Sequence, residues 1–223
     1  MKPSPRHKRN VREFTERKGA WLIGCEGTKT EPLYISGVIN WLSKNGFEPP
    51  EIDTFGVGYN TLSLVERMQK LFNDIDKQKA KGIKYERVFV VFDHDEFSAD
   101  NFNRAIHKCS ELGNNYIPIW SNESFELWLY LHFQLVESQL TRDQYCNLVS
   151  RELLNIGYNK EYDKADEQIA TLLMDSRRVA IAIRNSKRLR ANTNHIQSYV
   201  YRNPATEMDK LMEEIFNEAG FIL

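Results

Sequence analysis

Acidic residues directly follow two apolar runs of this sequence, and their placement is typical of metal-dependent chemistry. Glu26 follows the run WLIGC, and Asp93 and Asp95 follow the run RVFVVF, with His94 between them. Three like charges held close together are unfavourable unless a proton or a cation offsets them. One or two carboxylates commonly hold Mg²⁺ or Mn²⁺, while water and a substrate phosphate complete the shell. The sequence therefore predicts that Glu26, Asp93 and Asp95 form a site for Mg²⁺ or Mn²⁺.

These acids need elements that bring them together, and the sequence predicts alternating strands and helices. The run RVFVVF is apolar at almost every position, which is typical of strands buried on both faces of a parallel sheet. Strands are expected at residues 21–26, 51–57, 87–92 and 115–120. Helices are expected between them at residues 30–41, 61–79 and 100–112. This alternation implies an α/β fold with a mostly parallel central sheet flanked by helices.

The carboxyl ends of the strands form the edge at which ligands collect in an open parallel sheet. Glu26 ends the first predicted strand, and Asp93 and Asp95 follow the third. If these two strands are neighbours, the three acids meet at one edge. The structural alternative is that both aspartates cap the helix predicted from Asp100 and that Glu26 makes a hydrogen bond within its loop.

The chain divides into three parts. Residues 1–18 are rich in proline and basic residues and are expected to be disordered. Residues 19–120 carry the alternating strands and helices and are expected to form an α/β domain. Residues 121–223 show helical patterns, so a helical region packed on that domain is expected. Pro204, as a first helical residue, and Gly220, after the last turn, are expected to bracket the final helix.

Composition narrows the class of protein. The chain has 223 residues, of which 41% are hydrophobic, and a formal net charge of −1, which is ordinary for a globular protein. No apolar run approaches the roughly 20 residues that span a bilayer, so no membrane partner is expected. The basic amino-terminal segment lacks the apolar stretch of a secretory signal. Three cysteines without CxxC spacing argue against a disulfide framework or a zinc site, and a cytoplasmic location is expected.

Basic residues are candidates for contacts with the phosphates of a nucleic acid. The stretch from Arg177 to Arg202 contains seven basic residues and no acidic residue. Lys29, in the loop after the first predicted strand, is a further candidate for a phosphate contact. The alternative is that the basic stretch is a solvated helix face. The candidate phosphate contacts within this stretch are Arg184, Lys187, Arg188 and Arg190.

Four blocks of the sequence resemble those of a known family. The blocks CEGTKTEPLYI, VVFDHDEF, SNESFELWLYLHF and NPATEMDKLMEEI occur in this order. Together they resemble the RloB-like proteins of bacterial restriction and phage-defence loci, a family that includes one component of the AbiL abortive-infection pair. The resemblance extends from about residue 20 to residue 217.

The resemblance implies a fold and an activity. It implies a variant of the Toprim fold and a metal-dependent nuclease of the abortive-infection type, acting on RNA (tRNA among the candidates) or on DNA. Glu26 would act as general acid or base or complete the metal shell, and Asp93 and Asp95 would hold Mg²⁺ or Mn²⁺. A co-encoded ATPase would control the activity, and the sequence leaves a homodimer open.

The block SNESFELWLYLHF departs from the family pattern at one point. Glu123 and Ser124 stand where the family usually has proline and a small residue. Glu126 keeps the pattern and is a candidate catalytic residue at or beside the metal, with a purely structural role as an equal alternative. Asn122 is a candidate phosphate contact. Core packing is expected for Trp128, His132 and Phe133.

Other functions are weaker predictions for the same residues. GCEGTKT superficially resembles a phosphate-binding loop, but the glycine that precedes the lysine in G-x-x-x-x-G-K-[ST] is missing. Two aspartates after an apolar strand are also typical of haloacid-dehalogenase phosphatases, so a phosphohydrolase is a weak alternative. A module that binds nucleic acid or a partner protein without catalysis is the main alternative. The acidic residues favour the nuclease, because a module that only binds phosphate has no use for three acids beside its basic surface.

Overall fold

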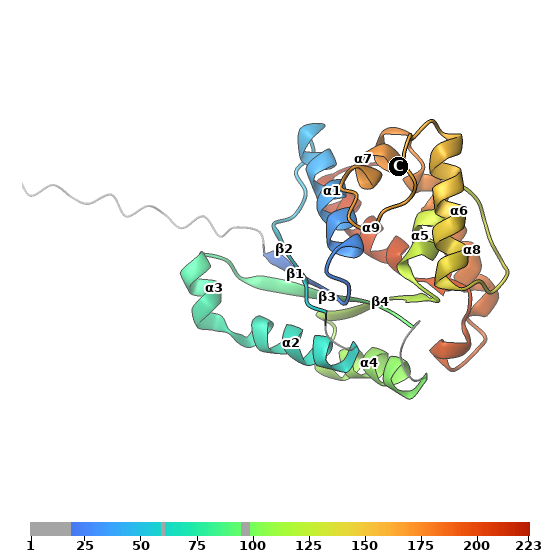
Figure 1. Cartoon of the computed structure of the whole chain (residues 1–223). Coiled ribbons are helices and arrows are strands. Elements are labelled where there is room, and N and C mark those ends of the chain that lie inside the picture. The colour runs from blue at the N-terminus through green and yellow to red at the C-terminus, as the bar shows by residue number, and fades with distance from the viewer. Residues whose placement is uncertain (1–18, 59–60, 95–98) are drawn as a thin grey trace, which may run out of the picture.

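A five-stranded sheet forms the centre of the protein in a computed structural model that describes residues 19–58, 61–94 and 99–223 (Figure 1). The strands lie in the order β2-β1-β3-β4-β5. The first four run parallel, and β5 pairs antiparallel with β4. The prediction of a mostly parallel sheet is therefore confirmed. The strands are β1 Ala20–Cys25, β2 Ile52–Gly56, β3 Tyr85–Asp93, β4 Tyr116–Asn122 and β5 Ala205–Thr206.

Helices cover both faces of the sheet (Figure 1). One face carries α2 Thr61–Asn73, α3 Ile75–Lys81 and α4 Ala99–Leu112. The other face carries α1 Thr30–Lys44, α5 Phe125–Leu131, α6 Arg142–Asn155, α7 Gln168–Asp175, α8 Val179–Thr193 and α9 Met208–Ala219. Within the described residues, none of these helices is long and apolar enough to cross a membrane.

Strand side chains alternate between two hydrophobic cores, one on each face of the sheet. Trp21 and Ile23 of β1 belong to the core beneath α1 and the C-terminal helices, whereas Leu22 belongs to the core beneath α2 and α4. In β3, Phe89 faces the first core and Val90 faces the second. Because both faces are buried, these strands are apolar at nearly every position.

The C-terminal helices complete the core of the sheet. Trp128 of α5 and Leu211 of α9 belong to the same buried cluster as Ile23 and Phe89 of the strands. Both α5 and α9 contact β4 directly. The carboxyl edge of the sheet is therefore bordered by residues from both halves of the chain.

Two stretches of the sequence with helical periodicity, the predicted helix of residues 61–79 and a stretch around Arg177, are each divided in the structure. Asp74 ends α2 and caps α3, where its side chain accepts a hydrogen bond from the backbone N–H of Lys77. Arg177 separates α7 from α8 because its backbone has a left-handed φ of 54°. Both divisions depend on local backbone geometry that leaves the apolar periodicity of the sequence unchanged.

The final helix begins later than predicted. Pro204 is not its first residue, because Ala205 and Thr206 form β5 and pair with Asn122 and Ser121 of β4. A strand this short has too few residues to show an alternating pattern. Gly220 ends α9 as expected, in the left-handed conformation with a φ of 70°.

Candidate active site

The strand order reverses between β1 and β3, and this makes their carboxyl ends the expected binding site of the sheet. The chain leaves β1 for β2 on one side and returns to β3 on the other. Cys25 at the end of β1 lies level with Val91 of β3, and Asp93 lies level with Ser121 of β4. The first and third strands are neighbours, so the acids that follow them share one edge.

Glu26 continues the pairing of β1 with β3 beyond the end of the strand. Its backbone N–H donates to the carbonyl oxygen of Val91 over 2.9 Å. Its side-chain Oε2 accepts a hydrogen bond from the backbone N–H of Asp93 over 3.2 Å. The predicted proximity of Glu26 and Asp93 is therefore present in the structure.

Asp93 is buried, with 5% of its surface exposed. Its Oδ2 accepts hydrogen bonds from the backbone N–H of Phe125 over 2.9 Å and from Nη2 of Arg142 over 3.2 Å. Its Oδ1 is buried and has no hydrogen-bond partner among the described residues. Burial raises the pKa of Asp93 well above its usual range, and the charges of Glu31 and Glu126 raise it further. A buried oxygen left without a donor costs about 1–3 kcal/mol, so Oδ1 is suited to a ligand.

Glu31 is a carboxylate of this site that sequence reasoning missed. It lies in the first turn of α1 with 6% of its surface exposed, and burial raises its pKa, as does the charge of Glu126. Its carboxylate accepts a hydrogen bond from the backbone of Gly27. A Cβ at Gly27 would lie 2.2 Å from Oε2 of Glu31, so a larger residue there would force this carboxylate to move. The sequence did contain an indication of this role, because Glu31 is an acidic residue at the start of the helix that follows the first strand.

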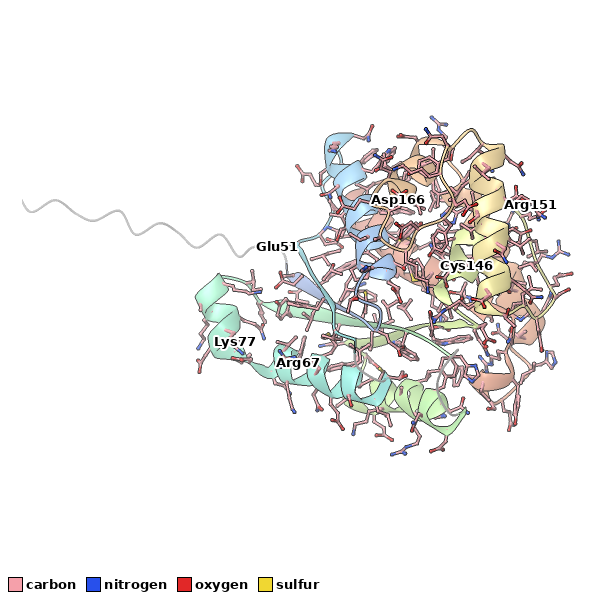
Figure 2. The ribbon with its side chains drawn as sticks, in the orientation of Figure 1. Glu51, Arg67, Lys77, Cys146, Arg151 and Asp166 are labelled. Carbon is pink, nitrogen blue, oxygen red and sulfur yellow. The ribbon has the colours of Figure 1, made fainter. Side chains whose placement is uncertain are left out.

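Glu126, in the first turn of α5, reaches the same place with only 2% of its surface exposed. Its Oε1 accepts a hydrogen bond from the hydroxyl of Tyr162 over 3.0 Å and lies 3.4 Å from Nζ of Lys164. Its Oε2 lies 3.7 Å from Nε of Arg142. Tyr162 and Lys164 belong to the segment between α6 and α7, in which Figure 2 labels Asp166. The C-terminal half thus supplies Arg142 and Lys164, the cations that lie beside Glu126.

A cavity of about 210 Å³ joins these residues at the carboxyl edge. It combines three acids, Glu31, Asp93 and Glu126, with three basic residues. Glu26 lies beside the cavity, bound to the backbone of Asp93, and is not one of its lining residues. The lining residues are Gly27, Thr28, Lys29, Thr30, Glu31, Asp93, Phe125, Glu126, Arg142 and Lys164.

The acids fit a magnesium ion that keeps most of its water. Among residues 19–58, 61–94 and 99–223, no three His, Cys, Asp or Glu side chains form a metal-binding group. Mg²⁺ usually needs only one or two carboxylates besides water and phosphate. Asp93 Oδ1 and Glu126 Oε2 are buried oxygens without a hydrogen-bond donor in the described structure, which meets that requirement. Asp95, predicted as a second aspartate ligand, lies outside the described residues, as does the basic tail of residues 1–18.

The predicted phosphate-binding residues fall into two groups. Lys29 lines the cavity, whereas the four basic residues of α8 do not. Lys187 lies 2.5 Å from Glu213, and Arg188 lies 3.3 Å from Glu137. The other two are Arg190, which pairs with Asp209, and Arg184, which is exposed. Acids from α9 and from the segment between α5 and α6 therefore offset part of the basic stretch, although the stretch itself contains none.

The aromatic residues after Glu126 pack in the core, as predicted. Trp128 and His132 are fully buried, and Phe133 packs against the same cluster. His132 Nδ1 contacts the carbonyl oxygen of Trp128 over 2.9 Å and therefore carries the proton. The hydroxyl of Tyr34 then donates to His132 Nε2 over 3.0 Å. Burial lowers the pKa of His132 to about 4, so the ring is neutral and structural.

Comparison with known proteins gives one match. The family model described as RloB-like protein matches residues 21–215. The chain matches none of the curated proteins and none of the solved structures with which it was compared. The matched range includes every residue that lines the cavity. Because the match extends over most of the chain, this protein belongs to the RloB-like family.

Proposed function

We propose that this RloB-like protein is a Mg²⁺-dependent phosphodiesterase that cleaves nucleic acid in defence against phage. The observation that carries the proposal is the buried Oδ1 of Asp93, which has no hydrogen-bond donor in the described structure and belongs to a cavity lined by both acids and cations. The site lies at the point where the strand order reverses, which is where α/β sheets bind ligands. The acids that follow β1 and β3 support a Toprim-like variant of the fold.

The charges of the cavity suit a phosphodiester. Lys29, Arg142 and Lys164 lie around the same space and would attract a phosphate and offset charge that develops during its displacement. Arg142 already donates to Asp93, so its position is fixed before a substrate arrives. A preorganised cation of this kind needs little rearrangement in the transition state.

The acids would hold the metal and manage protons. Asp93 Oδ1 and Glu126 Oε2 are the oxygens that would hold Mg²⁺, and a bound ion would polarise the phosphate and activate water. Glu26, fixed by the backbone N–H of Asp93, would position the attacking water or accept its proton. Family membership supports the further proposals of a defence role and of control by a co-encoded ATPase.

The main alternative is a module that binds nucleic acid without cleaving it. It is favoured by the ion pairs within the cavity, because Arg142 and Lys164 already offset part of the charge of Asp93 and Glu126. If these cations take the place of a metal ion, the site would bind phosphate without catalysing its cleavage. Metal binding therefore separates the two functions.

Calorimetry with Mn²⁺ tests the proposal. Wild type is expected to bind the ion, and Asp93→Asn is expected to bind at least about tenfold more weakly because it loses a charged ligand. Asp100→Asn is the matched control, since Asp100 is exposed at the start of α4 and pairs with Arg104. Cleavage of RNA and DNA strands by the same proteins should follow metal binding.

Equal Mn²⁺ affinity of Asp93→Asn and wild type would place the metal elsewhere. Failure of wild type to bind Mn²⁺, also in the presence of nucleic acid, would favour the non-catalytic module. Thermal unfolding of each variant confirms that it is folded before its affinity is compared.

A further inference from the structure

The two carboxylate oxygens of Glu126 have different surroundings. Oε1 accepts a hydrogen bond from the hydroxyl of Tyr162 over 3.0 Å and lies 3.4 Å from Nζ of Lys164. Oε2 is buried without a hydrogen-bond donor among the described residues, and Nε of Arg142 lies 3.7 Å from it. The two oxygens of an ionised carboxylate are equivalent until their surroundings distinguish them. The donors on Oε1 therefore decide which oxygen of Glu126 is left for a ligand.

Both donors on Oε1 come from the segment of residues 156–167, which connects α6 to α7. The side chain of Lys164 is 47% exposed, and an ammonium group on a flexible stem is strongly hydrated. Its attraction for Glu126 is therefore screened by water and fixes no orientation of the carboxylate. Tyr162 is partly buried, and a tyrosine side chain is rigid because it has only two torsion angles. Tyr162 is thus the residue that orients the carboxylate.

Tyr162 is itself held at two points. Its backbone N–H donates to Oγ of Ser150 on α6 over 3.0 Å. Its side chain lines a gap of only about 10 Å³, which it shares with Tyr34 and Leu129 among others. A gap of this size holds at most about one water molecule. The ring is therefore packed closely, and its hydroxyl is a fixed donor for Glu126.

The hydroxyl of Tyr162 also keeps its proton. Burial raises the pKa of Tyr162 well above its usual range, and the charge of Glu126 raises it further. A protonated hydroxyl beside an ionised carboxylate acts as the donor in their hydrogen bond. The bond to Oε1 is thus available at every pH at which a carboxylate binds a cation.

This arrangement leaves Glu126 with one oxygen for a cation. Binding through both oxygens would require Oε1 to turn toward the ion and give up its bond to Tyr162. The long stem of Lys164 can follow such a turn, whereas the packed ring of Tyr162 cannot. Oδ1 of Asp93 is another single buried oxygen without a donor in the described part of the chain.

The choice between one and two oxygens distinguishes two common ions. Ca²⁺ takes six to eight oxygen ligands and commonly binds a carboxylate through both oxygens. Mg²⁺ demands near-ideal octahedral geometry and usually keeps several waters. The cavity of about 210 Å³ has room for such waters. Single oxygens from Asp93 and Glu126 therefore suit Mg²⁺ better than Ca²⁺.

We infer that Tyr162 determines the metal specificity of the site, because it holds Oε1 of Glu126 and leaves a one-oxygen ligand that favours Mg²⁺ over Ca²⁺. Tyr162 is a positioning residue, since it acts through Glu126. The inference rests on the proposed function, which takes the cavity as a metal site. Removal of a residue that hydrogen-bonds a metal ligand typically changes metal affinity about 10–100-fold.

Competition against Mn²⁺, followed by calorimetry, gives the affinities for Mg²⁺ and Ca²⁺ that test the inference. Tyr162→Phe keeps the ring and removes the donor, so Glu126 gains its second oxygen. The ratio of Mg²⁺ affinity to Ca²⁺ affinity is expected to fall at least about tenfold. Tyr158→Phe is the matched control, because it removes a hydroxyl from the same segment. That hydroxyl donates to Asp166, labelled in Figure 2, and to Gln168, and neither of these lines the cavity.

Two further variants separate orientation from charge. Lys164→Gln removes a cation that competes with the metal and leaves the bond from Tyr162 in place. It is expected to raise the affinity for both ions by a similar factor, with their ratio unchanged. Tyr162→Phe is also made in a Glu126→Gln background. There it should leave the ratio unaltered, because the carboxylate through which Tyr162 acts is absent.

The outcomes distinguish this inference from the proposed function. Equal affinity ratios in Tyr162→Phe and wild type would overturn the inference, even if the protein binds metal and cleaves nucleic acid. A fall of the ratio in the Glu126→Gln background would also overturn it. Wild type that binds none of the three ions, with or without nucleic acid, would overturn both. A fall that requires Glu126 would support the inference even if no cleavage is found. Thermal unfolding first confirms that each variant is folded.

Discussion

Arg142 donates a hydrogen bond from Nη2 to Oδ2 of Asp93 over 3.2 Å, and this contact joins the first residue of α6 to the last residue of β3. The same guanidinium lies 3.7 Å from Glu126. One cation therefore stands between two buried acids that the sequence separates widely. Its removal is informative for both stability and catalysis.

Arg142→Ala is expected to lower the free energy of unfolding by about 2 kcal/mol, because two buried carboxylates lose their shared cation. For a chain of this size the melting temperature should fall by about 4–8 °C in metal-free buffer. Mn²⁺ should restore more stability to the variant than to wild type, since it replaces the missing charge. Cleavage should fall about a hundredfold.

The control for this change is Arg151→Ala on the same helix. Arg151 lies on the outer side of α6 and pairs with its neighbour Glu152 (Figure 2). An exposed pair of this kind contributes at most about 1 kcal/mol. Equal losses of stability in the two variants would show that the contact between Arg142 and Asp93 has no special importance.

Glu31→Gln is expected to raise stability while it reduces activity. Glu31 is buried near Glu126 and Asp93, and its raised pKa shows that the site opposes its ionisation. A neutral side chain of the same shape removes this unfavourable charge, so the free energy of unfolding in metal-free buffer should rise by about 1 kcal/mol. Thermal unfolding with a chelator measures the change. Glu48→Gln, at an exposed position, should leave stability unaltered.

His132 is expected to remain neutral in the folded protein until the pH falls to about 4. Its unfolded pKa is about 6.5, so the unfolded chain binds the proton first as the pH falls. The contribution of His132 to stability is therefore complete above about 6.5 and is lost as the pH falls through about 4. Nitrogen chemical shifts should show the proton on Nδ1 throughout this range. A ring that titrates near 6.5 in the folded state would contradict the assignment.

Salt dependence of nucleic-acid binding tests the basic residues. Lys29→Ala and Lys164→Ala remove charges of the cavity, and each should lower the slope of log affinity against log salt by about 1. Arg184→Ala should act similarly if α8 holds the backbone. Lys187→Ala should have a smaller effect, because Lys187 already pairs with Glu213. Unchanged slopes in all four variants would remove these residues from the interface.

Much of the fold could be predicted because its signals are local. The apolar run of β3 and the acids after β1 and β3 are contiguous in sequence, and parallel pairing brings their ends together. Glu26 and Asp93 could therefore be named in advance, whereas Glu126 was named only from the resemblance to the RloB-like family. Whether they act as predicted depends on the metal and cleavage experiments.

The remaining parts depend on contacts between distant segments. Arg142 and Lys164 look like ordinary surface charges in the sequence, and only the packing of α6 and of the segment before α7 brings them to Glu126. Glu31 lies in a segment with a helical pattern, and that pattern alone gave no reason to assign it to the site. The acids that pair with Lys187 and Arg190 come from α9. No local charge pattern in the sequence reveals these ion pairs.

The order in which the cavity residues occur along the chain has a consequence for synthesis in the cell. A ribosome releases Glu26 and Asp93 early, whereas Lys164 follows much later and β5 and α9, which complete the sheet and its core, come last. The nascent chain would therefore carry Asp93 and Glu126 before the cations that pair with them, Arg142 and Lys164, are made. Under the proposed function, this delay would keep unfinished chains inactive.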